Sequence, residues 1–370
     1  MSIIKEIKEG KAQINIFEEN KISRKMPVFY NPVMKFNRDV ALLLLNAMKK
    51  KDMNIALPFA GTGVRGVRIL KELPSSLVKE IHINDISIIA CEKIRETIEL
   101  NSLSQEEKSK ISISCKDADL FFEESQGFDY IDIDPFGNPS GFLPAAIKKL
   151  SRNGIIAVTA TDTSALTGTY KNATARKYWS VSMRNELMHE LSVRILVRFV
   201  QMIGAMHDKA LTPIYSYAKD HYVRAFFICS KGRQKVDAII KEHKYIVYDK
   251  METQVVHADE ISKGSLYAGP LWVGQLWDSH LAEEISKNNL QLDLTREEQN
   301  FLNIVAEESK ICSVGFIDLA KFSKIFKKSC KTNFIIDKLK KNNIAAARTH
   351  FSDNAIRTTV SAQKLITLLS

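Results

Sequence analysis

The chain has 370 residues, of which 45% are apolar, so it is long enough to form two domains with well-packed cores. Its net charge of +10 favours an anionic partner such as nucleic acid. The five cysteines form no Cys-x-x-Cys pair, so we expect neither disulfides nor a zinc site. The sequence contains neither a signal-peptide core nor an apolar run of membrane-spanning length. We therefore expect a soluble, cytoplasmic protein without a membrane partner.

Between residues 53 and 160, short apolar segments alternate with amphipathic stretches, which predicts a parallel α/β sheet. The predicted strands cover residues 54–57, 81–84, 111–115, 130–133 and 155–159. The predicted helices cover residues 66–72, 88–101, 142–150 and 182–206. Residues 212–229 are rich in β-branched and aromatic side chains and are interrupted at residues 218–220, so we expect an antiparallel strand pair that closes the sheet. This architecture, a parallel core with an antiparallel last strand, is typical of Rossmann-like methyltransferases rather than of dinucleotide-binding folds.

A polar and basic joint at residues 230–233 predicts a domain boundary. We therefore expect one domain over residues 1–232 and a smaller α+β domain over residues 233–370. In the second domain the sequence predicts strands near residues 245–248 and 267–273, followed by mostly helical structure from residue 281.

The second domain contains a basic stretch, residues 321–348, with nine Lys or Arg and a single acid, Asp337. Four of its lysines recur at helical spacing: Lys321, Lys324, Lys328 and Lys331. Phe322 and Phe326 fall on the opposite face of such a helix. The pattern fits a solvated helix face, and it equally fits a surface that binds a phosphate backbone.

A glycine-rich motif, Gly61-Thr62-Gly63-Val64-Arg65-Gly66, lies between the first predicted strand and its helix, and Asp85 ends the second strand. The glycines allow a tight turn and close approach to a ligand, and the acid can bind ribose hydroxyls. Nicotinamide dinucleotides and S-adenosylmethionine both use this geometry, and a glycine-rich turn can also lack a ligand. Arg65 or Arg68, on the helix that follows, could neutralise a carboxylate such as that of a methionine moiety.

The fourth predicted strand ends in Asp134-Pro135-Phe136-Gly137. A carboxylate can accept hydrogen bonds from an exocyclic amine, the carbonyl of a rigid proline can be a second fixed acceptor, and an aromatic ring can stack on a flat base. A plain β-turn at a strand end has the same residue types. Asp/Asn-Pro-Pro-aromatic turns recur in amine methyltransferases, whereas a dehydrogenase requires a proton donor and no histidine ends a predicted strand. We therefore expect S-adenosyl-L-methionine rather than NAD.

Together, these segments resemble the tRNA guanine-26 N2-dimethyltransferase family of archaea and eukaryotes. The resemblance extends in order over nearly the whole chain. The matching pieces lie at residues 28–32, 37–39, 61–68, 117–118, 132–137, 159–162, 269–272 and 348–351. The Asn31-Pro32 pair behind two aromatic residues, with Asn37-Arg38-Asp39 soon after, is more specific than the glycine loop.

The resemblance implies cofactor contacts in the first domain. Arg38 and Arg68 would contact the methionine end of S-adenosyl-L-methionine, together with the loop of Gly61 and Gly63. Asp85 would hold the ribose. The adenine would lie between Asp117 and Ala118.

The resemblance also implies the substrate site and the partner, which is tRNA. Asp134 would be the catalytic carboxylate, assisted by the carbonyl of Pro135, and Phe29 and Phe136 would sandwich the target guanine. The second domain would hold the tRNA body through its basic stretch, with Lys321, Lys324 and Lys328 facing the phosphates.

Two positions depart from the family pattern. Many members have an acid late in the first strand, where this chain has Leu57, and some have two Cys-x-x-Cys pairs where only Cys229 lies near, so we expect no metal. The sequence leaves three other functions open: an amine methyltransferase acting on another nucleic acid or protein, an NAD-dependent oxidoreductase, and a non-catalytic RNA-binding protein.

Overall fold

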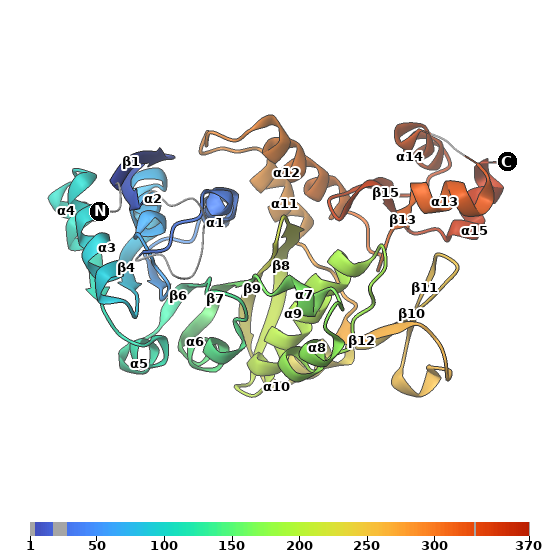
Figure 1. Cartoon of the computed structure of the whole chain (residues 1–370), viewed down its shortest axis with the longest axis horizontal. Coiled ribbons are helices and arrows are strands. Elements are labelled where there is room, and N and C mark those ends of the chain that lie inside the picture. Colours follow the sequence, from blue (N-terminus) through green and yellow to red (C-terminus); the bar gives the residue numbers. More distant parts are fainter. Residues whose placement is uncertain (1–3, 18–27, 329–330, 370) are drawn as a thin grey trace. The chain divides into compact units, whose positions relative to one another are not determined.

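The computed structural model describes residues 4–17, 28–328 and 331–369 (Figure 1). The chain forms two compact units. The first comprises Met1–Val158 and Lys287–Glu298, and the second comprises Thr159–Ser286 and Gln299–Ser370. A compact unit need not be an independently folding domain, so the boundary at residue 232 stays a prediction.

All five parallel strands that the sequence predicts are present. They are β3 (Met53–Leu57), β4 (Val78–Asn84), β5 (Ile111–Ser114), β6 (Phe128–Ile133) and β7 (Leu150–Ala160). The predicted antiparallel pair is also present, as β8 (Lys209–Lys219) and β9 (Tyr222–Lys231). The sheet has the strand order β5-β4-β3-β6-β7-β9-β8. The predicted fold, a Rossmann-like methyltransferase sheet whose last strand is antiparallel, is confirmed.

Strand β6 brings its carboxyl end to the same sheet edge as its neighbours. It pairs in parallel with β3, where Ile55 faces Tyr130, and with β7, where Ile133 faces Val158. Five of its six residues are buried, as expected for a strand covered on both faces. Asp134 therefore follows the strand at an edge where neighbouring loops converge.

Helices follow the strands as the periodicity predicts. The predicted helices present are α2 (Val64–Glu72), α3 (Ile88–Leu100) and α6 (Leu143–Lys149), whereas α5 (Ala118–Glu124) and the short α4 (Gln105–Ser109) between α3 and β5 were not among the predicted elements. The long helix predicted from residue 182 begins later, as α9 (Met188–Ala205). Its start is delayed because the Asn185 side chain accepts a hydrogen bond from the Leu187 amide at 3.1 Å and closes a turn instead.

An amino-terminal hairpin, β1 (Ile4–Glu9) and β2 (Ala12–Phe17), and helix α1 (Lys35–Met48) were not among the predicted elements. The hairpin turns at Gly10, whose φ of +57° lies in the left-handed region. A Cβ atom at Gly10 would lie 2.3 Å from Glu72 Oε1, so no larger residue fits there.

A buried ionic network joins this hairpin to α1 and α2. Glu9 receives Arg38 Nε at 2.7 Å and Arg68 Nη1 at 3.0 Å. Arg68 also donates to Asp39 at 2.5 Å and to Glu72 at 2.8 Å. All five side chains are at least nine-tenths buried, so each charge depends on its partners for compensation.

Glu9 is the acidic centre of this network. Burial raises its pKa, but Arg38 and Arg68 outweigh burial and lower the pKa from 4.5 to about 2. Its ionised form therefore stabilises the fold above pH 4.5, and this contribution, on the order of 3 kcal/mol, is lost as the pH falls from 4.5 toward 2. We expect Glu9→Gln to lower the free energy of unfolding by about that amount at pH 7. Below pH 4.5, the difference in the free energy of unfolding between the variant and the wild-type protein should decrease.

Urea unfolding of both proteins at several pH values measures this difference. Glu6→Gln is the matched control, because Glu6 is exposed on the same strand and should change stability little. Equal destabilisation by the two substitutions would show that the network does not depend on the Glu9 charge.

The second unit contains α9, the β8-β9 pair and two small antiparallel sheets. One sheet has the order β11-β10-β12, and its strands are β10 (His243–Asp249), β11 (Glu252–Val256) and β12 (Tyr267–Trp272). The other has the order β13-β15-β14, from β13 (Ile317–Asp318), β14 (Ala346–Thr349) and β15 (Ser352–Thr358). The two predicted strands correspond to β10 and β12, while the β13-β15-β14 sheet was not predicted.

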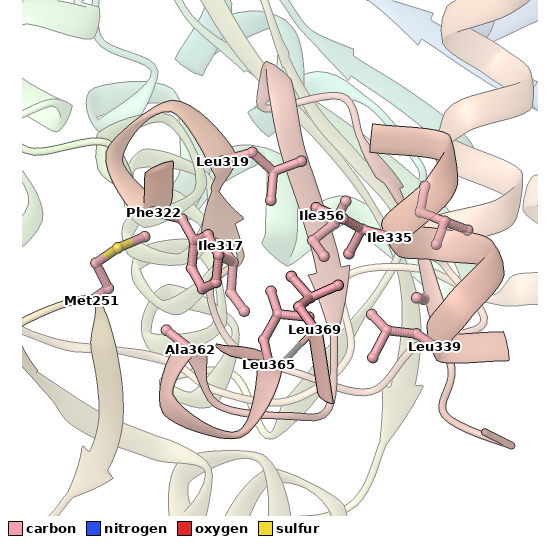
Figure 2. Packing of buried hydrophobic residues seen from close by; sticks show 12 residues of the cluster. Met251, Ile317, Leu319, Phe322, Ile335, Leu339, Ile356, Ala362, Leu365 and Leu369 are labelled. Atoms are coloured by element: carbon pink, nitrogen blue, oxygen red, sulfur yellow. The ribbon is translucent and has the colours of Figure 1, made fainter. Parts of the chain in front are cut away.

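The remaining α-helices in the described part of the chain are α7 (Thr163–Leu166), α8 (Lys171–Tyr178), α10 (Arg233–Lys241), α11 (Ser279–Ser286), α12 (Arg296–Glu308), α13 (Leu319–Phe326), α14 (Thr332–Lys341) and α15 (Ala362–Leu369). Side chains of α13, α14 and α15 pack over β13 and β15 in one apolar cluster, in which Phe322, Leu339, Ile356 and Leu365 are buried (Figure 2). Among the described residues, no helix combines the length and apolar character needed to cross a bilayer.

The basic stretch is not one continuous helix. Helix α13 ends at Phe326, because Lys327 adopts the left-handed conformation with φ of +51°. Lys328 therefore lies beyond the helix, and Lys331 is the residue before α14. The expectation that Lys321, Lys324 and Lys328 share one helix face is wrong.

Candidate active site

The Asp134 turn lies directly after β6. Asp134 is half-buried, Pro135 is buried and the ring of Phe136 is 44% exposed. Gly137 has a φ of +76°, which turns the chain back sharply after the aromatic residue. The turn therefore presents a carboxylate and an exposed ring at the same end of the strand.

Arg65, the fifth residue of the glycine-rich motif, holds this carboxylate. Its Nη2 atom lies 2.5 Å from Asp134 Oδ2 and donates to Asn37 Oδ1 at 3.0 Å, while Nη1 lies 3.1 Å from Asp132 Oδ2. The Arg65 side chain is only 12% exposed, so these interactions are poorly screened by water. From the sequence, Arg65 was a candidate partner for the carboxylate of a ligand. Its pairing with Asp134 was not predicted, and this makes Arg65 the main residue of the site whose role sequence reasoning missed.

If the site transfers a methyl group, as the resemblance implies, we expect Arg65→Gln to lower kcat about 10- to 100-fold, because it removes a charge-assisted hydrogen bond that orients Asp134. Arg65→Lys keeps the charge without the planar fork and should recover only part of the rate. Steady-state kinetics together with calorimetric titration of the cofactor measure both effects. An unchanged kcat with a weakened cofactor would assign Arg65 to the carboxylate of the methionine moiety instead.

The two predicted base-stacking rings lie together. The ring centroids of Phe29 and Phe136 are 4.2 Å apart, with the ring planes at 76°. A base held between two rings separates them by two stacking distances, each about 3.4 Å. The rings therefore touch edge to face in this structure, and a guanine can enter between them only when they move apart.

The segment that carries Phe29 is tied to the buried network. The Tyr30 hydroxyl donates to Glu9 at 2.8 Å, and Arg38 donates to the carbonyl of Asn31 at 3.2 Å. Burial is the main cause that raises the pKa of Tyr30, followed by the Glu9 charge, so the hydroxyl stays a donor at neutral pH. Phe29 thus directly precedes a segment that is anchored at Tyr30 and Asn31.

The glycine-rich loop has the geometry that the motif predicts. Gly61 and Gly63 have φ of +54° and +78°. A Cβ atom at Gly61 would lie 2.8 Å from the Phe29 carbonyl oxygen, and a Cβ atom at Gly66 would lie 2.6 Å from Ile83 Cδ1. The loop is therefore closed against both the Phe29 segment and β4, and at Gly61, where the close atom belongs to the backbone and φ is positive, only glycine fits.

The acid after β4 keeps acceptor capacity for a ligand. Asp85 accepts the Gly61 amide at 2.9 Å through Oδ2 and the Ser87 amide at 3.0 Å through Oδ1. Each carboxylate oxygen can accept a second hydrogen bond, so ribose hydroxyls can bind there. The neighbouring Ile86 is 69% exposed and offers an apolar surface for a flat heterocycle.

Asp117 and Ala118 begin helix α5. Asp117 caps the helix by accepting the Asp119 amide at 2.9 Å, and Ala118 is buried. Leu120, one turn along, is 44% exposed. Asp85 thus keeps free acceptor capacity, and Ile86 and Leu120, which the sequence did not assign, offer exposed apolar surface; this combination fits a nucleoside such as that of S-adenosyl-L-methionine.

Arg38 and Arg68 occupy a different environment from the one that their predicted role suggests. Their guanidinium groups are paired with Glu9, and Arg68 also with Asp39 and Glu72. Arg68 is only 1% exposed. In the structure both arginines stabilise the first unit, and their contact with the methionine end of the cofactor stays a prediction.

The three lysines predicted to bind tRNA differ in their surroundings. Lys321 lies 2.8 Å from Glu186 and donates to the Tyr248 hydroxyl at 3.1 Å. Lys328 donates to the Leu369 carbonyl, whereas Lys324 is exposed. Among the described residues, no cluster of three or more His, Cys, Asp or Glu side chains is arranged to hold a metal ion.

Comparison with known proteins places this site in a family. The family model for N2,N2-dimethylguanosine tRNA methyltransferases matches residues 10–370. The tRNA (guanine(26)-N(2)/guanine(27)-N(2))-dimethyltransferase of Aquifex aeolicus is 35% identical, and the alignment covers 97% of this chain and 94% of that protein. The tRNA (guanine(26)-N(2))-dimethyltransferase of Methanobrevibacter smithii is also 35% identical, with coverage of 98% and 96%.

The structure of Trm1 from Pyrococcus horikoshii, solved with S-adenosyl-L-methionine, superposes with a TM-score of 0.88 at 33% identity, covering 98% of this chain and 99% of that one. The family model, the sequence relatives and the solved structure therefore agree. The chain belongs to the N2,N2-dimethylguanosine tRNA methyltransferase family.

Proposed function

We propose that this protein transfers one or two methyl groups from S-adenosyl-L-methionine to the exocyclic N2 of guanosine 26 in tRNA. The observation that carries the proposal is the convergence of the Asp134 carboxylate, fixed by Arg65, with the Phe29–Phe136 ring pair beside the glycine-rich loop. The family to which the chain belongs supports the reaction and the substrate.

In the proposed mechanism the first task of the site is to orient the amine. The lone pair of the guanine N2 is delocalised into the ring, so its hydrogens must be held while the nitrogen becomes pyramidal. The Asp134 carboxylate and the Pro135 carbonyl accept these hydrogens, and Phe29 and Phe136 hold the ring plane. S-adenosyl-L-methionine supplies the methyl group as an electrophile on its sulfonium centre.

A carboxylate is too weak a base to deprotonate an aryl amine in advance. Asp134 therefore orients the amine first and accepts its proton as positive charge develops on the nitrogen. Fixing the nitrogen in line with the methyl group, about 3–3.5 Å away, is the larger contribution to the rate. The monomethyl product keeps one N–H for Asp134 to hold, so a second methylation can follow at the same site.

Mass spectrometry of nucleosides tests the reaction. The purified protein is incubated with S-adenosyl-L-methionine and an unmodified tRNA transcript, and the RNA is then digested. We expect N2-methylguanosine followed by N2,N2-dimethylguanosine. Transcripts with adenosine at position 26 or 27 fix the position, since the Aquifex aeolicus relative is named for both. A product that survives the change at position 26 would overturn that assignment, and no methylated guanosine would overturn the substrate.

We also propose that residues 1–232 perform catalysis and that residues 233–370 bind the tRNA body, as the motif content of the two segments suggests. A cytoplasmic location completes the proposal. It is supported by the four free cysteines among the described residues, Cys91, Cys115, Cys229 and Cys312.

The predicted role of the basic stretch is tested by a triple substitution of Lys321, Lys324 and Lys328 to Gln. If these lysines contact phosphates, the tRNA KM rises and the slope of log KM against log salt decreases by about 2 to 3. Lys321 also pairs with Glu186, so thermal unfolding must be compared first. An unchanged salt slope in a folded variant would restrict these lysines to structural and solvated positions.

A further inference from the structure

The chain between β7 and α9 presents a positively charged surface. Residues 161–187 contain four Lys or Arg and two acids, Asp162 and Glu186, and Glu186 is paired with Lys321 at 2.8 Å. Asp162 already accepts Lys177 at 3.1 Å and the hydroxyl of the buried Tyr178 at 2.5 Å, which fixes helix α8 in place. Three exposed cations remain on this segment: Lys171, Arg176 and Arg184. Its two acids are already paired with Lys177 and Lys321, so the charge of these three cations is not cancelled within the segment.

Trp179 has an unusual position at the end of α8. It adopts the left-handed conformation with φ of +50°, where glycine is normally found and a bulky side chain is unfavourable. Its indole is nevertheless 50% exposed, with the ring centroid 5.0 Å from that of Phe199. The Trp179 carbonyl accepts Arg198 at 3.2 Å. The structure thus holds an exposed aromatic ring rigidly on a residue whose left-handed backbone conformation is unfavourable for a bulky side chain.

A second exposed ring stands at the other end of α8. Tyr170 precedes the helix and is 64% exposed. The nine-residue separation from Trp179 corresponds to about 13 Å along the helix axis. Lys171 and Arg176 lie between the two rings in the sequence. Exposed aromatic rings interleaved with cations are typical of surfaces that stack bases and follow a phosphate backbone.

A cavity of about 180 Å³ adjoins α7 and the β8–β9 turn. Polar side chains with hydroxyl or nitrogen groups make up most of its lining: Thr163, Ser164, Thr167, Thr169, Tyr222, Arg184, His189 and His221. Hydroxyl and guanidinium groups are the usual partners of phosphate oxygens. Asp220 also lines the cavity, but Lys219 lies 4.0 Å from its carboxylate and offsets its charge.

We propose that these features form one RNA-binding surface, here called the α8 surface and defined by Tyr170, Lys171, Arg176, Trp179 and Arg184. It takes unpaired or distorted RNA, with bases stacked on Trp179 and Tyr170 and a phosphate held in the cavity beside Arg184. The inference rests on the proposed function, since it assigns a second contact region to the same tRNA. A protein partner is less well matched, because the cavity, although Met188, Ala218 and Val223 also line it, offers hydroxyl groups and a guanidinium that suit a phosphate.

Tryptophan emission provides a direct test without turnover. The chain has three tryptophans, and Trp272 and Trp277 are buried, so Trp179 dominates the response to solvent and to a stacking base. Titration of unmodified tRNA into the full-length protein, without cofactor, should quench the emission. The quenching should disappear in Trp179→Phe, which keeps a stacking ring but removes the indole signal.

Kinetics test the energetic contribution. Trp179→Gly relieves the left-handed backbone and should fold at least as well, yet it should raise the tRNA KM about 5- to 150-fold with kcat unchanged. Trp179→Phe should stay close to wild type. Substitution of Lys171, Arg176 and Arg184 to Gln should decrease the salt slope of KM by about 2 to 3, whereas the same change at the exposed Lys235, Lys241 and Lys263 should alter it far less.

The outcomes separate this inference from the reaction itself. Guanosine methylation with unquenched Trp179 and a wild-type KM in Trp179→Gly would overturn the α8 surface and leave the proposed function standing. Quenching by tRNA without any methylated guanosine would support the surface and overturn the reaction. Equal effects of the two lysine and arginine triple variants would show a non-specific charge effect and would also overturn the proposal.

Discussion

Asp134→Ala should abolish methyl transfer while the cofactor still binds. Removing a group that holds and then accepts the reacting proton is expected to lower kcat by about 10²- to 10⁴-fold. The cofactor contacts come from other elements, namely the glycine-rich loop, Asp85 and the start of α5, so cofactor affinity should hardly change. Single-turnover methylation with both substrates saturating, together with calorimetric titration of S-adenosyl-L-methionine, measures the two effects separately.

Asp134→Asn is the matched control for this experiment. The amide keeps an acceptor oxygen and the size of the side chain but loses the charge that pairs with Arg65. If an acceptor oxygen is enough to orient the amine, Asp134→Asn should retain more activity than Asp134→Ala. If the negative charge of Asp134 is essential, Asp134→Asn should be no more active than Asp134→Ala. Collapse of cofactor affinity in both variants would place Asp134 in the cofactor pocket and contradict its assignment.

Loss of both stacking rings should have the second largest effect. Each ring is expected to contribute about 1–3 kcal/mol to holding the extruded base, so Phe29→Ala combined with Phe136→Ala should lower kcat/KM for tRNA by about 30- to 10⁴-fold. Cofactor affinity should stay near the wild-type value. Initial rates at limiting tRNA measure this change, and leucine at each position is the control for lost volume without lost aromaticity.

The two rings should not contribute independently. In this structure they contact each other at 4.2 Å, so each single substitution also removes a ring–ring contact that the base must break on entry. A double-mutant cycle should therefore give a coupling energy different from zero. Strict additivity would mean that the base enters without separating Phe29 from Phe136.

The sheet could be predicted because its information is local. Apolar runs such as residues 130–133 need only their own composition to identify buried strands, and the β8–β9 turn interrupts its apolar pattern visibly. The glycine-rich loop and the Asp134 turn were found for the same reason. Each motif lies within a few residues at the end of a strand.

Interactions between distant residues could not be predicted in this way. The hairpin residues 4–9 repeat an Ile-Lys-Glu triplet rather than alternating with period two, which hid strand β1. The pairs Glu9–Arg68 and Arg65–Asp134 join residues 59 and 69 positions apart, so nothing in either local sequence reveals them. Helix α8 was missed because its residues are mostly polar and show no apolar stripe.

The close approach of Gly61 to the Phe29 carbonyl links the two ligands of this enzyme. The backbone that would cradle the cofactor and the backbone that would present a stacking ring leave no room for a methyl group between them. A shift of one segment must therefore be accommodated by the other. If the bound cofactor strengthens binding of the base by favouring one position of Phe29, a bound base strengthens binding of the cofactor by the same free energy. This equality holds because coupling between two binding events is reciprocal. Cofactor and tRNA should therefore bind to this protein cooperatively rather than independently.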